Sequence, residues 1–105
     1  MQCRKESVID LVRIPDTTLV IAGQADGSCL PLRITVQQGQ VVEIALKATD
    51  GGMFRFQAAD LNLDLMADTG LTVKQIFTAS TTGKFEFTCG YHGSNSAIKG
   101  EIEVK

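Results

Sequence analysis

The sequence has no tryptophan, one histidine and one tyrosine, and only two prolines among its 105 residues. It has no excess of basic residues, because ten Lys and Arg are set against twelve Asp and Glu and form no basic stripe. A nucleic-acid-binding role is therefore not expected. No apolar run approaches the length of a membrane span, so no transmembrane segment is predicted. The first ten residues, MQCRKESVID, lack the apolar stretch of a signal peptide, as expected for a cytosolic protein or for a chain already trimmed.

Cysteine is also scarce, with three residues at positions 3, 29 and 89. This number is too small for a disulfide scaffold and allows at most one pair within the chain. The position of Cys3 fits the lipid-carrying cysteine at the start of a trimmed lipoprotein, but an ordinary thiol near the terminus is the favoured interpretation. These three cysteines do not decide between an oxidising and a reducing compartment.

What the sequence does contain is a repeated strand signal. Hydrophobic residues make up 44% of the chain and ten glycines mark turns, which favours one packed domain over residues 1–105. Apolar and polar residues alternate with a period of two, which predicts β-strands. The predicted strands cover residues 8–14, 17–22, 32–36, 41–48, 53–57, 71–79, 84–89 and 101–105. Seven to eight short strands predict an all-β, antiparallel sandwich or barrel. Residues 58–70 fit either a helical turn or a long loop, and residues 90–100 a polar loop.

The stretch FEFTCGYHG, residues 85–93, places a cysteine and the only histidine three positions apart. Cys89 shares a strand face with Phe85 and Phe87, so its sulfur is expected to point into the core. His92 follows in a glycine-rich loop that would let its ring fold back toward the sulfur. A thiolate and an imidazole that converge in this way suit copper. The alternatives are a buried apolar cysteine beside an exposed loop histidine.

An enzymatic Cys–His pair is the less favoured alternative. A cysteine hydrolase also needs an oxyanion hole, a third residue that orients the histidine, and a cleft. None of these is readable in the sequence, so the chain is not expected to be an enzyme. The carboxylates of Asp60 and Asp64 alternate on a solvated face and offer too few oxygen ligands for a hard metal.

Two long segments resemble the cupredoxins, the family of blue-copper β-sandwich proteins. GKFEFTCGYHGSNSAIKGEIEVK (residues 83–105) is similar to the C-terminal signature of that family, in which an aromatic–x–aromatic–x–Cys strand leads into a loop with a ligand histidine. CLPLRITVQQGQVVEIALKATDGGMFRFQ (residues 29–57) is similar to its earlier half. The resemblance implies a Greek-key sandwich, an extracytoplasmic or periplasmic location, and copper handling or electron transfer.

Carried over by position, the resemblance makes Cys89 the thiolate ligand and His92 an imidazole ligand. Phe54 stands where the family has its first histidine, and Ile98 where it has its methionine. A blue-copper centre needs two histidines and one cysteine in a plane, which one molecule with a single histidine cannot supply. Cu(I) is therefore favoured over Cu(II), because it accepts soft ligands in low coordination.

Two further residues are candidate copper ligands. The thioether of Met53 lies beside the first-histidine position, although it points away from the core if Phe54 and Phe56 point inward. Cys29 precedes the third strand, close to the end of the sandwich where the site is expected. For Cys29, packing of the core is favoured over metal ligation and over a disulfide with Cys89.

The resemblance implies a redox or copper-donor protein as partner, of unknown identity. A homodimer in which each chain contributes its one histidine is a further interpretation. The alternative function is a copper-free cupredoxin-fold module for binding or assembly, with a degenerate metal site.

Overall fold

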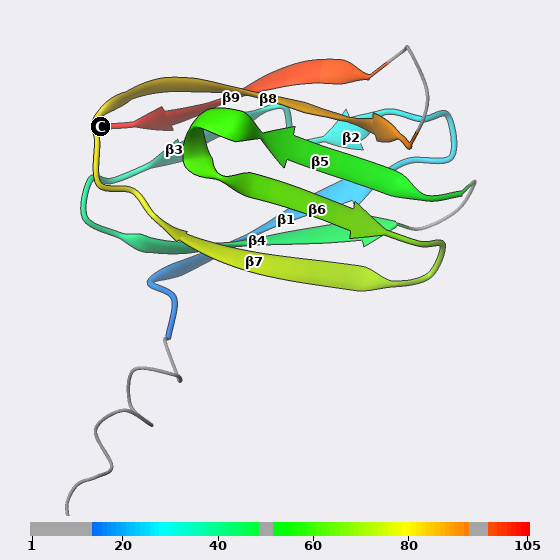
Figure 1. Ribbon diagram of the computed structural model, residues 1–105, viewed down its shortest axis with the longest axis horizontal. Helices are drawn as coiled ribbons and strands as arrows, with labels where there is room; N and C mark the ends of the chain where they lie inside the picture. The colour runs from blue at the N-terminus through cyan, green and yellow to red at the C-terminus, as the bar shows by residue number, and fades with distance from the viewer. Residues whose placement is uncertain (1–13, 49–51, 93–96) are drawn as a thin grey trace, which may run out of the picture.

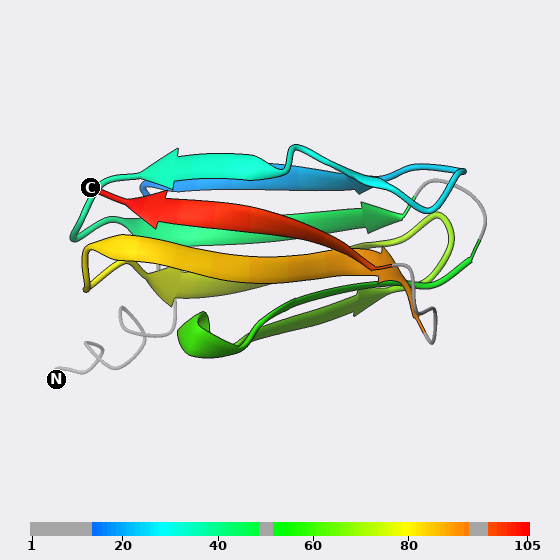
Figure 2. The ribbon, with the colours of Figure 1, turned by 90° about the horizontal axis from the view of Figure 1, so that it is seen from above.

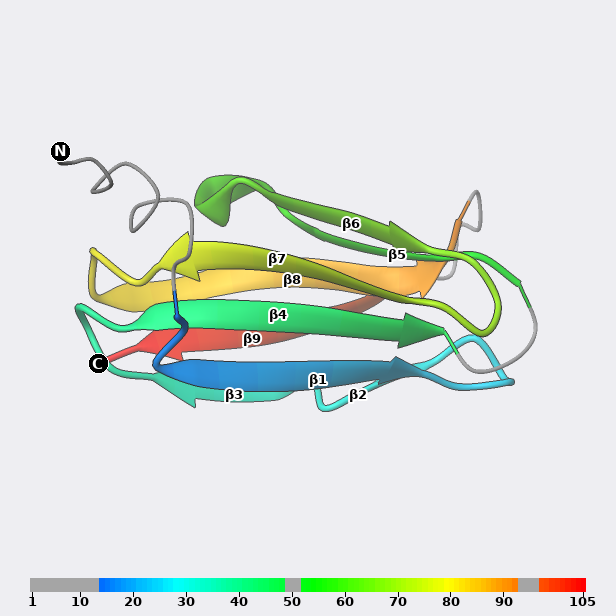
Figure 3. The ribbon, with the colours of Figure 1, turned by 90° about the horizontal axis from the view of Figure 1, so that it is seen from below.

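The computed structural model describes residues 14–48, 52–92 and 97–105. Its strands form two sheets that face each other, as Figures 1, 2 and 3 show from three sides. The four-stranded sheet has the order β2-β1-β4-β7 and the five-stranded sheet the order β3-β9-β8-β5-β6. The sandwich predicted from the alternation is therefore confirmed, with nine strands in the described residues where seven to eight were expected. In chain order the elements are β1 (Thr17–Gly23), β2 (Cys29–Leu30), β3 (Arg33–Val36), β4 (Val41–Ala48), β5 (Phe54–Ala58), the 3₁₀ turn η1 (Ala59–Leu61), β6 (Leu63–Ala67), β7 (Thr72–Thr78), β8 (Gly83–Tyr91) and β9 (Ile98–Val104).

Among the described residues five strand pairs are antiparallel, as expected, but two are parallel and depart from the expected antiparallel arrangement. β1 pairs with β4, with Leu19 opposite Ile44, and β3 pairs with β9, with Ile34 opposite Ile102. Both pairs arise because the chain moves to the other sheet between the two partners. β3 belongs to the five-stranded sheet, and after it the chain returns to the first sheet as β4, alongside β1.

The segment of residues 58–70 holds more structure than a loop. It contains η1 and then β6, in which Leu63 and Leu65 are buried and alternate with exposed Asp64 and Met66. Asn62 joins the two elements with a positive φ of 56°, a conformation that asparagine tolerates better than most residues. The predicted strand over residues 8–14 lies outside the described residues except for Ile14, which is exposed and not part of a strand.

The core lies between the sheets and is built by the alternation seen in the sequence. In β4, Val42, Ile44 and Leu46 are fully buried, while Lys47 is exposed. Burial of each such aliphatic side chain contributes about 1.5–3 kcal/mol. The fully buried large side chains from both sheets are Phe54, Phe56, Phe87, Ile21, Ile44, Leu46, Leu63, Leu65, Ile102, Val42, Cys29 and Cys89. Both cysteines of interest therefore belong to this core.

One side chain bridges the two sheets along their β6–β7 side. Gln75 of β7 accepts a hydrogen bond from the Asp64 backbone N–H at 3.1 Å and donates one to the Asn62 carbonyl at 3.0 Å. Its amide thus satisfies one N–H of β6 and the carbonyl of the residue that precedes the strand. No helix among the described residues is long and apolar enough to cross a membrane.

Candidate metal centre

Cys89 lies near the end of β8, with paired strands on both sides. It is opposite Phe56 of β5 and opposite Ile98 of β9. Directly opposed residues on antiparallel strands point to the same face, so these three side chains share the inner face of the sheet. The sulfur of Cys89 points into the core, as predicted, and the residue is fully buried.

Cys89 is joined to Cys29 by a disulfide bond with an S–S distance of 2.05 Å. Cys29 belongs to β2 in the other sheet, so the bond connects the two sheets across the core. Cys29 lies in the core, as expected, but the preference for simple packing over a disulfide with Cys89 was wrong. Sequence spacing could not show this pairing, because the two residues are 60 positions apart and meet only when the sheets stack.

Two aromatic rings close the core between the disulfide and the nearby loops. Phe54 of β5 is opposite Tyr91 of β8, and their ring centres are 4.7 Å apart. Phe54 is fully buried and packs so closely on Gly23 that a Cβ added there would lie 2.7 Å from the ring. The Tyr91 hydroxyl donates a hydrogen bond to the Ala25 carbonyl at 2.5 Å. In Figure 1, the β1–β2 loop, the start of β5 and the end of β8 all lie at this same end of the sandwich.

His92 and Met53 lie together at the rim of this end, outside the ring pair. The His92 backbone N–H donates a hydrogen bond to the Met53 carbonyl at 2.8 Å. His92 is exposed, and it lines a surface hollow of about 260 Å³ together with Arg55 and Thr88. Arg55 alternates with buried Phe54 and therefore faces away from the core. Met53 is 37% exposed.

The structure thus sorts the four predicted ligands into two pairs. Cys29 and Cys89 are bonded in the core, whereas Met53 and His92 meet through their main chains at the surface. His92 shares its hollow with residues of the outer face of the sheet, and Cys89 points to the inner face. Within residues 14–48, 52–92 and 97–105, no three His, Cys, Asp or Glu side chains are grouped so that they hold a metal ion.

The residues present do not fit a blue-copper centre. The sulfurs of Cys29 and Cys89 form a disulfide and are not thiolates. Phe54 has no lone pair to donate, and neither does Ile98, which lies opposite Cys89. The residues fit a Cu(I) ion only when the disulfide is reduced, because reduction leaves two soft sulfur ligands side by side.

Two carboxylates among the described residues have a lowered pKa, and hydrogen bonds are the main cause of both shifts. The Arg55 guanidinium binds the carboxylate of Asp64 through two hydrogen bonds, at 3.0 and 2.8 Å. The hydrogen bonds from Arg55 lower the pKa of Asp64. In the β1–β2 loop, the hydroxyl and the backbone N–H of Ser28 donate to the carboxylate of Asp26 and lower its pKa. The second interaction shapes the loop that leads into Cys29.

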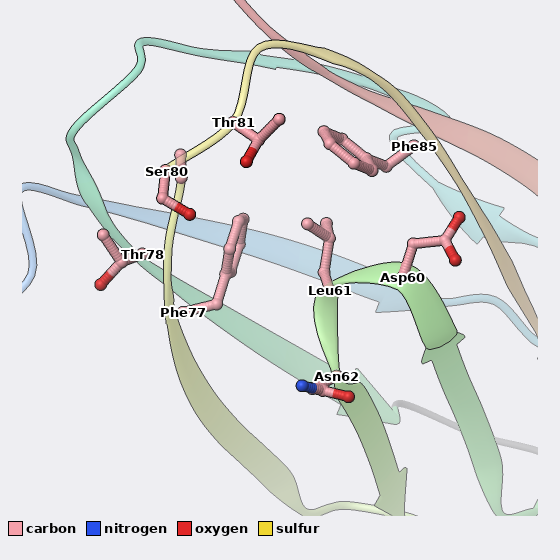
Figure 4. Close-up of a pocket in the computed structure, with 9 residues that line it drawn as sticks. Asp60, Leu61, Asn62, Phe77, Thr78, Ser80, Thr81 and Phe85 are labelled. Atoms are coloured by element: carbon pink, nitrogen blue, oxygen red, sulfur yellow. The ribbon is translucent and has the colours of Figure 1, made fainter.

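A second hollow, of about 240 Å³, lies at the opposite end of the sandwich between η1 and the β7–β8 turn. Figure 4 shows Leu61 between the rings of Phe77 and Phe85, with Asp60 beside them. It contains none of the predicted copper ligands and is not part of the candidate metal centre.

Sequence analysis did not identify Tyr91 as part of the centre. The signal was present, because the alternation that places Phe87 and Cys89 inward continues to Tyr91. Tyr91 was missed because residues 90–100 were expected to form a loop. In the structure β8 extends to Tyr91 and β9 begins at Ile98.

Residues 15–104 match the family described as the Cupredoxin-like domain. No curated protein matches the chain. Among solved structures, similarity is found to the Cu(I)-bound metal-binding domain of the Cu(I)-exporting P-type ATPase CopA of Streptococcus pneumoniae D39, with 19% identity, a TM-score of 0.68 and 84% of each chain covered.

A second similar structure is auracyanin A, a "blue" copper protein from Chloroflexus aurantiacus, with 18% identity, a TM-score of 0.63, and 84% of this chain and 98% of that chain covered. A third is subunit II of cytochrome c oxidase (CoxB) in a mixed disulfide with the thioredoxin-like TlpA, with 17% identity, a TM-score of 0.69, and 90% and 85% covered. Identities this low show a shared fold alone. Together with the family match over most of its length, this fold places the chain in the cupredoxin-like domain family.

Proposed function

We propose that this domain handles copper as Cu(I), and that the Cys29–Cys89 couple determines whether it does so. The observation that carries the proposal is the position of the two sulfurs, which lie in bonding contact at the end of the sandwich. In the disulfide form neither sulfur is available as a ligand. In the dithiol form the same backbone positions present two thiolates to one ion, and Cu(I) is satisfied by two soft ligands.

Two of the similar proteins support this proposal by their own chemistry. The CopA domain has the same fold and binds Cu(I). CoxB, also of this fold, forms a mixed disulfide with a thioredoxin-like protein, so thiol–disulfide exchange occurs on a cupredoxin-like scaffold. A copper-donor or redox protein is accordingly the proposed partner. An oxidising extracytoplasmic compartment is the proposed location, because disulfides persist there. The proposed role is not enzymatic.

Anaerobic titration with Cu(I) against a competing chelator tests the proposal. Reduced protein with Cys3→Ala is expected to take up one equivalent, and its oxidised form none. Cys29→Ala and Cys89→Ala are each expected to abolish uptake, because a single thiolate remains. His92→Ala is the matched control and is expected to bind as the parent does. Equal uptake by the oxidised and reduced proteins would contradict the role of the couple.

A copper-free binding or assembly module is the second candidate function. It is favoured by the Phe54–Tyr91 pair, which closes the core at the end where copper would enter. Reduced protein that takes up no Cu(I), and whose Tm is unchanged by Cu(I), would support this candidate instead.

A homodimer bridged by copper is a variant of the first candidate, since the exposed His92 of each chain is free to face a second copy. Size measurements with and without copper distinguish it. A copper-dependent dimer that His92→Ala abolishes supports the bridged form, and a monomer under both conditions excludes it.

A further inference from the structure

The two cysteines of the disulfide lie in strands that differ greatly in length and in the number of strands paired with them. Cys89 lies within the nine-residue strand β8, which is paired with β5 on one side and β9 on the other. Cys29 lies in the two-residue strand β2 at the edge of its sheet, where it is paired only with β1, through Gly23↔Cys29 and Ala22↔Leu30. Local opening requires far fewer broken contacts at Cys29 than at Cys89.

The chain on both sides of Cys29 is also exposed. Leu30, which follows it, is 55% exposed, and the loop of residues 24–28 precedes it. Figure 2 shows this loop extending past the strand ends at the same end of the molecule. An external reagent that reaches the disulfide after such an opening meets the sulfur of Cys29 first.

From this asymmetry we infer that Cys29 is the sulfur attacked in thiol–disulfide exchange, and that the co-reactant is an external dithiol. The dithiol's thiolate forms a bond to Sγ of Cys29 while the Cys29–Cys89 bond breaks. Cys89 leaves as a thiolate, and solvent supplies the proton that it takes up. The second thiolate of the dithiol then attacks the dithiol's own sulfur in the mixed disulfide. This closes the disulfide of the dithiol and releases Cys29 as a thiolate. The protein gains two electrons and the dithiol becomes a disulfide.

Tyr91 controls this opening by tying the loop to the stable part of the sheet. Its hydroxyl donates to the Ala25 carbonyl, 66 residues away in sequence, and its ring lies against Gly27, where an added Cβ would come within 2.8 Å. Gly27 also has a φ of 89°, which favours glycine and shapes the tight loop. Tyr91 is thus a positioning residue for exchange, and release of its hydrogen bond frees the segment that carries Cys29.

Mapping of the mixed disulfide tests which sulfur is attacked. Oxidised protein with Cys3→Ala is exposed briefly to glutathione, quenched with acid, alkylated and digested for mass spectrometry. Glutathione on Cys29 and the alkyl group on Cys89 is the expected result. Glutathione mainly on Cys89, or spread equally over both residues, would overturn the inference.

Single-thiol variants give an answer even if the mixed disulfide decays too quickly to trap. Cys89→Ala leaves the Cys29 thiol, and Cys29→Ala leaves the Cys89 thiol, each in the Cys3→Ala background. Cys29 is expected to react with Ellman's reagent at least about tenfold faster, since its segment opens more readily. Equal rates, or a faster Cys89, would refute the inference.

The role of Tyr91 has its own readout. Tyr91→Phe keeps the ring and removes one hydrogen bond, and is expected to raise the rate of reduction by dithiothreitol about fivefold. The control is Gln38→Ala, which removes the hydrogen bond from Gln38 to the Ser80 carbonyl at the opposite end and is expected to leave the rate unchanged. An unchanged rate in Tyr91→Phe, or an equal rise in the control, contradicts the role.

The inference adds a route of reduction to the proposed copper function, but none of these experiments contains copper. A failure of Cu(I) to bind would leave the identity of the attacked sulfur standing. Attack at Cys89 would likewise leave the Cu(I) titration unaffected.

Discussion

Removal of the disulfide is expected to destabilise this domain more than most single changes. The bond closes a loop of 60 residues between β2 and β8, so the unfolded chain is strongly restricted while the bond is intact. The chain-entropy relation for a loop of this length gives about 4 kcal/mol at 25 °C. For a domain of about 100 residues, a loss of that size lowers Tm by roughly 15–30 °C. Since small domains are stable by only about 5–15 kcal/mol, the reduced protein is expected to stay folded at 25 °C with a small margin.

The assay compares the oxidised protein with the Cys29→Ala/Cys89→Ala double variant by thermal and urea denaturation, both with Cys3→Ala. Alanine is the appropriate replacement because both positions are fully buried and a serine hydroxyl would bring a polar group into the core. Cys3→Ala alone is the control and is expected to leave Tm unchanged. A double variant that loses less than about 5 °C, or a parent protein whose Cys29 and Cys89 alkylate without reductant, would refute the reasoning.

Three further predictions concern the packing and the surface charge. Phe54→Ala removes a fully buried ring and is expected to cost about 3–5 kcal/mol in urea denaturation, with Phe54→Leu losing clearly less; equal losses would contradict this. Gly100→Ala brings a Cβ within 2.2 Å of a core phenylalanine ring and is expected to lower the free energy of unfolding by about 3 kcal/mol or more. Gly39→Ala has open space around the added Cβ but a φ of 90°, and is expected to lower it by about 1–2 kcal/mol. The pKa of Asp64 is lowered by Arg55. The contribution of this ion pair to the free energy of unfolding is therefore complete above about pH 4 and is lost as the pH falls further. Asp64→Asn is therefore expected to lower Tm by about 2 °C at pH 7 and much less at pH 2, and the same change at both values would contradict the ion pair.

The strands were predictable where the chemistry is local. The recurrence of Val42, Ile44 and Leu46 at every second position is a property of eight consecutive residues, and all three are buried in β4. β6 was not predicted, although Leu63 and Leu65 alternate equally well, because the turn before it depends on the positive φ of Asn62. Residue types do not specify such a conformation by themselves.

The candidate site was only partly predictable for a related reason. The inward direction of Cys89 follows from its strand face and is found in the structure. Its partner depends on how the two sheets stack, which places Cys29 of β2 beside it although 60 residues intervene. The copper ligands Cys89, His92, Met53 and Cys29 stay a prediction. In the structure the two sulfurs lie in the core, whereas His92 and Met53 lie at the surface.

The bridge made by Gln75 has a consequence for how this domain meets other copies of itself. Open sheet margins invite strands from other molecules, and this is a common route to aggregation. Along β6 and β7 the amide of Gln75 already engages the backbone of residues 62 and 64. The opposite margin ends in β2, which has only two residues, and β3, which has four. Strand addition is therefore hindered by this amide at residues 62 and 64 on one side, and restricted by short strands on the other.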